Sequence, residues 1–135
     1  MTALNRDRAT AYREGVEVEF PVAAATKIYA GSLVCVNGDG YAVPAADASG
    51  YRFVGAAMEQ QDNGSGANGE KVVRVRRTGV FEFDAASITQ AMVGDAMYAA
   101  DDHTFDDAAG ATNDVKVGVL VKYVSATKGW IDIAR

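Results

Sequence analysis

The chain has 135 residues, 49% of them hydrophobic and 23% charged, which is the size and composition of one soluble globular domain. Its formal net charge of -5 argues against a nucleic-acid partner, because phosphate backbones attract clusters of Lys and Arg. A single cysteine, no secretory signal pattern and no apolar run of about 18 residues argue against secretion and membrane insertion, and favour folding in a reducing cytoplasm.

The N-terminal segment, residues 1–15, is polar and aperiodic and predicts a flexible arm ahead of a single β domain over residues 16–135. Within that domain, alternation of apolar and charged residues predicts strands with one buried face in three places: 16–20, 72–77 and 130–133. Pro21 indicates that the first of these strands lies at a sheet edge or ends there.

Turn-forming residues separate the other short apolar runs. The segment 37–40 (Asn-Gly-Asp-Gly) lies between two such runs, 33–36 and 41–44, and predicts a β-hairpin. Small polar residues over 62–69 predict an exposed loop, with a loop that orders on a partner as an open alternative. Only 85–92 is compatible with a short helix, so the predicted class is all-β, as a small barrel or sandwich.

A repeat with a spacing of 63 residues underlies this pattern. Four matches occur at this spacing: Glu19-Phe20 with Glu82-Phe83, Gly31 with Gly94, Asp39 with Asp102, and Val54-Gly55 with Val117-Gly118. We therefore predict two similar β units, a pseudo-repeat over 18–59 and 81–122, that close around one shared hydrophobic interior. Chance similarity in a chain rich in Ala and Gly is the alternative.

Candidate catalytic residues are scarce. The only histidine, His103, lies among the aspartates of 101–107, where we expect a solvated turn; cation binding is the alternative, although the spacing does not match an EF-hand. Cys35 lies in an apolar run without a neighbouring base to activate its thiol. No glycine-rich segment carries the Lys-Ser or Lys-Thr of a phosphate-binding loop. We therefore predict a non-enzymatic protein without catalytic, cofactor-binding or metal-binding residues.

Arginines are the best candidates for contacts with a partner. Arg74 and Arg76 lie two positions apart on a predicted strand and share its outer face, and Arg77 extends this basic stretch. This stretch either docks on an acidic neighbour or lies in water beside cross-strand carboxylates. The predicted arm contributes further basic residues, and it either orders on a partner surface or stays a disordered tail: Arg6, Arg8 and Arg13.

Three stretches carry a resemblance to a known family: Phe20–Gly31, Gly40–Asp47 and Asn113–Gly118. They resemble small proteins encoded beside the major capsid gene of tailed phages and prophages, which are grouped with capsid decoration or cement proteins. The resemblance extends over nearly the whole chain and is carried mainly by glycines and alanines. It implies a compact β-barrel or β-tulip-like subunit, commonly trimeric, on the outer shell where capsomers meet.

The resemblance therefore predicts a virion structural protein on the capsid exterior, made in the host cytoplasm. Such a protein would form a homo-oligomer, a trimer, and stabilise the shell by bridging subunits of the major capsid protein. One alternative is a head-closure or tail-tube component of the virion, which would form a ring. Another is a small β-barrel ligand-binding domain, which would need a concave polar pocket.

Overall fold

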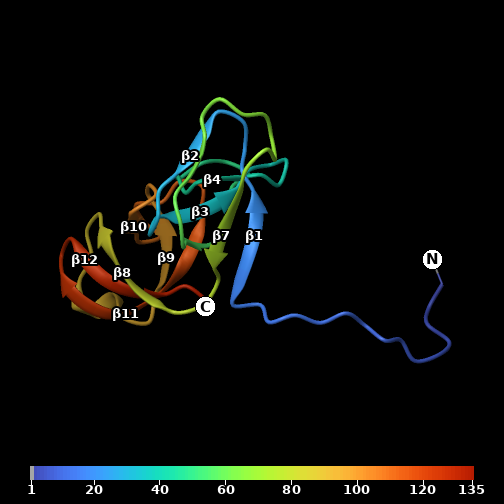
Figure 1. Cartoon of the computed structure of the whole chain (residues 1–135). Helices are drawn as coiled ribbons and strands as arrows, with labels where there is room; N and C mark the ends of the chain where they lie inside the picture. The colour runs from blue at the N-terminus through green and yellow to red at the C-terminus, as the bar shows by residue number, and fades with distance from the viewer. Residues whose placement is uncertain (1) are drawn as a thin grey trace.

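Residues 2–135 are described by a computed structural model and are folded almost entirely as β-strands (Figure 1). The strands are β1 (Glu17–Pro21), β2 (Thr26–Ile28), β3 (Leu33–Val36), β4 (Ala42–Pro44), β5 (Arg52–Ala57), β6 (Gln61–Asn63), β7 (Val72–Arg76), β8 (Val80–Ala85), β9 (Ala96–Ala99), β10 (Thr104–Asp106), β11 (Lys116–Ser125) and β12 (Lys128–Asp132). In this range the only helix is one 3-10 turn, η1 (Gln90–Met92), so the predicted all-β class is confirmed. Residues 2–135 contain no helix with the length and apolar character needed to cross a membrane.

Most strands belong to two units with the same strand order. Unit 1 is the sheet β1-β7-β5-β3-β4, and unit 2 is the closed barrel β8-β12-β11-β9-β10, in which β10 returns to β8. Strands β8 and β9 begin 63 residues after β1 and β3, whereas β12 begins 56 residues after β7. The shared order is a property of the structure, and the repeat limits 18–59 and 81–122 stay a prediction.

Each unit is bent at a glycine that lies against backbone. Gly55 in β5 and Gly118 in β11 have φ angles of 147° and 156°, and the strand register shifts beside each of them. A Cβ on Gly55 would overlap the carbonyl oxygen of Arg76, and a Cβ on Gly118 would overlap that of Asp132. Such bulges bend a strand sharply, which allows a sheet of five short strands to curl toward closure.

Unit 2 closes more completely than unit 1, and a proline accounts for the difference. In unit 2 the amide of Asp84 donates to the carbonyl oxygen of His103 at 3.1 Å, where β8 pairs with β10 in parallel. The equivalent residue in unit 1 is Pro21, which has no N–H to donate. Unit 1 is therefore joined there by a single parallel bridge between Val22 and Ala42, and β1 lies at the edge of its sheet.

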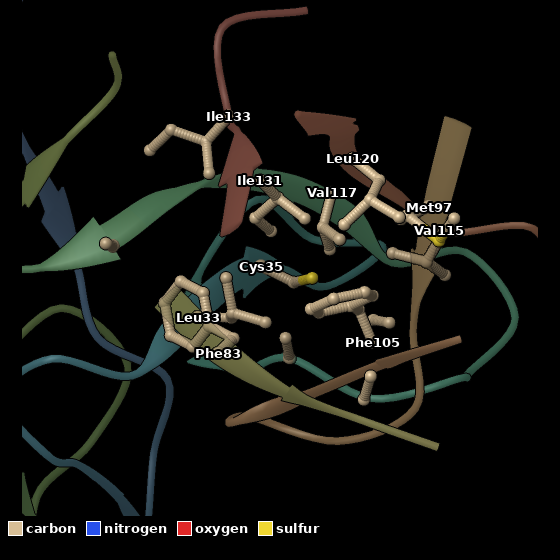
Figure 2. Close-up of a cluster of buried hydrophobic side chains, with 14 of the residues drawn as sticks. Leu33, Cys35, Phe83, Met97, Phe105, Val115, Val117, Leu120, Ile131 and Ile133 are labelled. Carbon is tan, nitrogen blue, oxygen red and sulfur yellow. The ribbon is translucent and has the colours of Figure 1, made fainter. Parts of the chain in front are cut away.

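The main hydrophobic core is shared by both units (Figure 2). Leu33 and Cys35 of unit 1 pack in it with Phe105, Leu120 and Ile131 of unit 2. All four residues of β3 are buried, and its other face contributes to a second, smaller cluster inside unit 1: Val22, Ile28, Val34, Ala42, Ala57, Val73 and Val75. The structure thus has a shared core and a smaller one, where the sequence analysis expects one interior.

A hydrogen-bonded contact between two loops fastens the units together. The carboxylate of Asp47 accepts the backbone N–H groups of Thr112 at 2.9 Å and Asn113 at 2.7 Å. These two hydrogen bonds hold the pKa of Asp47 below its ordinary value. The stability that Asp47 contributes is therefore present above the ordinary pKa of an aspartate, and it is lost as the pH falls through the lowered pKa.

The expectation of an exposed loop over 62–69 is wrong at its start. Asp62 and Asn63 belong to β6, which pairs with β2 in a small separate sheet, and Asn63 is only 1% exposed. Neither strand alternates apolar and polar residues over a useful length, so the pattern that predicts the longer strands does not detect these two.

We predict that Gly118→Ala lowers the free energy of unfolding by about 2–4 kcal/mol, because the new methyl group would displace the backbone of Asp132. Gly55→Ala should have a similar effect. The control is Gly38→Ala, since a Cβ there meets nothing within 4 Å. Urea denaturation of the three variants measures this, and a Gly118→Ala protein as stable as the Gly38→Ala control would contradict the importance of the bulge.

Candidate docking surface

The N-terminal arm projects away from the folded body (Figure 1). Every residue from 2 to 14 is exposed, including two large apolar side chains, Leu4 at 74% and Tyr12 at 84%. Extended chain with exposed apolar side chains gains little in isolation, and it can bury those side chains on a partner. Arg6 and Arg8 lie along this arm, so two of the predicted contact residues belong to its free part.

The root of the arm is attached to the edge of unit 1. Arg13 Nη2 donates to the carbonyl oxygen of Glu17 at 3.3 Å and to Glu19 Oε2 at 3.2 Å. One position further along the chain, the backbone amide of Arg77 donates to the carbonyl oxygen of Val16 at 2.8 Å. Arg13 thus covers part of the exposed edge of β1, which would otherwise be open to pairing with another strand.

A groove of about 510 Å³ lies beside the root of the arm. Its walls come from both units: Val18, Phe20, Phe53, Val54, Arg77 and Thr78 from unit 1 and the segment that follows it, and Ile133 and Ala134 from the C-terminal end. The lining is mainly apolar with one guanidinium, a combination that accepts an apolar side chain flanked by a carboxylate. In Figure 1 the C-terminus lies close to the start of β1, so the groove is placed where the arm leaves the body.

The basic residues of β7 differ from one another in their surroundings. Val73 and Val75 are buried while Arg74 and Arg76 are exposed, so the two arginines share the outer face as predicted. Arg74 has carboxylate neighbours, with Nη1 3.8 Å from Glu17 Oε1 and Nε 3.9 Å from Glu59 Oε1. Within residues 2–135, no ion pair involves Arg76 or Arg77, and these two remain available for an acidic partner.

Sequence reasoning identified the arginines and missed the apolar part of this surface. Phe20, Phe53 and Ile133 come from three distant parts of the chain, and each lies in a strand or tail whose local pattern places it in the core. Only the packing of β1 and β5 against the C-terminal segment brings them to one groove. The exposed Leu4 and Tyr12 were visible in the sequence as isolated apolar residues in a polar arm.

The single histidine lies in an acidic cluster on unit 2 rather than on the docking surface. His103 Nδ1 is 3.1 Å from Asp84 Oδ2, and Nε2 is 3.6 Å from Asp101 Oδ1. The hydrogen bond to Asp84, followed by the charges of Asp101 and Asp102, raises the pKa of His103 above its ordinary value. The oxygens and ring nitrogen of residues 101–103 lie within 4.8 Å of one another. All of these carboxylates have His103 as a neighbouring counter-charge.

Cys35 is unsuited to nucleophilic chemistry. It is buried in the shared core, and burial raises the pKa of its thiol to about 12. The thiol therefore stays protonated at neutral pH and packs as a small apolar side chain.

No protein-family model matches the chain, and comparisons with curated proteins and with solved structures give no significant match. The function has to be argued from the surface itself.

We predict that His103 titrates above pH 6.5, because its protonated form is stabilised by three aspartates. The stability that this cluster contributes is complete below the ordinary pKa of histidine and is lost as the pH rises through the raised one. Since the chain has one histidine, its ring protons give a single NMR titration curve. Asp84→Asn should move the midpoint back down, and a wild-type midpoint at or below 6.5 would show that the cluster does not form.

Proposed function

We propose that the protein is a capsid decoration protein of a tailed phage, a virion structural protein that binds the capsid exterior and bridges subunits of the major capsid protein. The observation that carries the proposal is the combination of a fully exposed arm and an apolar groove at its root. The resemblance of Phe20–Gly31 and Asn113–Gly118 to capsid decoration proteins points to the same role.

The arm gives one subunit the reach to contact two capsid subunits. Thirteen exposed residues in extended form span roughly 45 Å, which exceeds the distance across most contacts between neighbouring proteins. The body would sit on one subunit through the groove and the exposed arginines of β7, while Leu4 and Tyr12 anchor the arm on the next. Tyr and Arg are the residue types that contribute most to protein interfaces.

Symmetry would strengthen a modest contact. A trimer at a threefold position presents three arms at once, so the second and third arms bind at high local concentration. Ordering each arm costs chain entropy, which makes binding depend on a capsid surface that offers all the sites together. Bridging of this kind adds interface area between capsomers and opposes the outward pressure of packaged DNA.

The direct test is co-sedimentation of the purified protein with empty expanded heads. We expect stoichiometric uptake of the full chain and at least about tenfold weaker uptake after deletion of residues 2–12, which leaves Arg13 in place to cover β1. The melting temperature should stay within about 1 °C, because the deleted residues are all exposed. A deleted protein that binds heads as well as the full chain would contradict the role of the arm.

A second variant separates anchoring from simple arm length. Replacing Leu4 and Tyr12 by serine should weaken uptake by about tenfold or more, since it removes both apolar anchors. The matched control is Val124→Ser, which changes a 46% exposed residue of β11 in the other unit. Sedimentation velocity of the free protein tests the trimer, and closed rings in the absence of heads would instead indicate a head-closure or tail-tube subunit.

A further inference from the structure

The loop between β6 and β7 encloses a polar hollow of about 290 Å³ that plays no part in the docking surface. Oxygen-bearing side chains of Asp62, Asn63 and Glu70 border it, together with Gly66 and Lys71. The loop is well fixed to the end of β1: the amide of Gly69 donates to the carbonyl oxygen of Val22 at 2.9 Å. The hollow is therefore a defined feature of unit 1.

The orientation of the Asn63 side chain is determined by its neighbours. Its Nδ2 donates to three carbonyl oxygens, those of Val22 at 3.3 Å, Ala23 at 2.9 Å and Ala67 at 2.9 Å. Exchanging the two ends of the amide would place an oxygen against three oxygens, so Oδ1 has to face the other way, toward Gly66. Asn63 is 1% exposed, and within residues 2–135 no donor lies within hydrogen-bond distance of Oδ1.

A carboxylate faces the same point. A Cβ on Gly66 would overlap Asn63 Oδ1 and would lie 2.6 Å from Glu70 Oε2, so both oxygens converge on the space above this glycine. Two acceptors that converge without a donor between them repel each other, and leaving a buried acceptor unpaired is costly. A bound cation would remove both costs at once.

We propose that this hollow is a binding site for a hard divalent cation, Ca²⁺ in preference to Mg²⁺, with Asn63 Oδ1, Glu70 and Asp62 as its ligands. Ca²⁺ accepts amide and carboxylate oxygens in irregular geometry, whereas Mg²⁺ demands a near-ideal octahedron. Asp62 already orients one oxygen, because Oδ1 accepts the amide of Gly64 at 2.9 Å. Lys71 borders the hollow with the opposing charge, which favours a weak site with a dissociation constant of about 10⁻⁴–10⁻³ M.

The acidic cluster around His103 is the competing position for a cation on this chain. Its carboxylates already have the histidine as a partner, and among the described residues Asn63 Oδ1 is the one buried side-chain oxygen left without a donor. A cation at Asn63 would tie the loop of 64–70 to β6. It would therefore stabilise unit 1, whose barrel is the less completely closed of the two.

The test is calorimetric titration of the EDTA-treated full-length protein with CaCl2, accompanied by melting curves with and without Ca²⁺. We expect one site per chain and a melting temperature that rises with Ca²⁺ concentration, because the cation binds the folded state alone. Glu70→Gln should weaken Ca²⁺ binding at least about tenfold. Without Ca²⁺ this variant should melt no lower than the wild type, since the new amide can donate to Asn63 Oδ1.

Two matched variants locate the binding. Asp39→Asn removes an exposed carboxylate from a turn elsewhere in unit 1 and should leave Ca²⁺ binding unchanged, as should Asp101→Asn in the histidine cluster. The proposal is overturned by the absence of saturable binding up to about 10 mM Ca²⁺, by equal binding in Glu70→Gln, or by loss of binding in Asp101→Asn. Heads are not needed for this experiment, so its outcome is independent of capsid docking.

Discussion

The contact between a strand glycine and the backbone of the facing strand is the constraint on which the fold depends. Gly55 and Gly118 lie so close to the carbonyl oxygens of Arg76 and Asp132 that neither can carry a side chain. Strands of three to six residues form most of both units, and such short strands curl into barrels only where a bulge bends them. The bend in β11 also brings Val117 and Leu120 into the shared core beside Cys35.

Closure of the fold also determines where the protein can be contacted. Unit 2 is a complete barrel, whereas Pro21 leaves β1 at an open edge in unit 1, and the arm begins at that edge. Arg13 covers the edge and the groove opens beside it, so the least self-contained part of the fold coincides with the part suited to a partner. A rigid body with one mobile attachment fits a protein that fastens other proteins together.

The sequence predicted those parts of the fold that repeat or alternate. Alternation located β1, β7 and β12, and the spacing of Gly55 and Gly118 placed equivalent bends in two units. Strands β2 and β6 escaped prediction because three residues are too few to show a period. The groove and the environment of Asn63 escaped it for another reason: each depends on residues that are distant in the chain, and local patterns hold no information on their packing.

The most direct measurement is a cryo-EM reconstruction of expanded heads incubated with the purified protein. We expect density for the two barrels above one capsid subunit and continuous density for residues 2–14 on a neighbouring subunit, with Leu4 and Tyr12 buried at the contact. Attached barrels whose arms stay without density, or heads that acquire no added density at saturating protein, would contradict the proposal that the arm bridges capsid subunits.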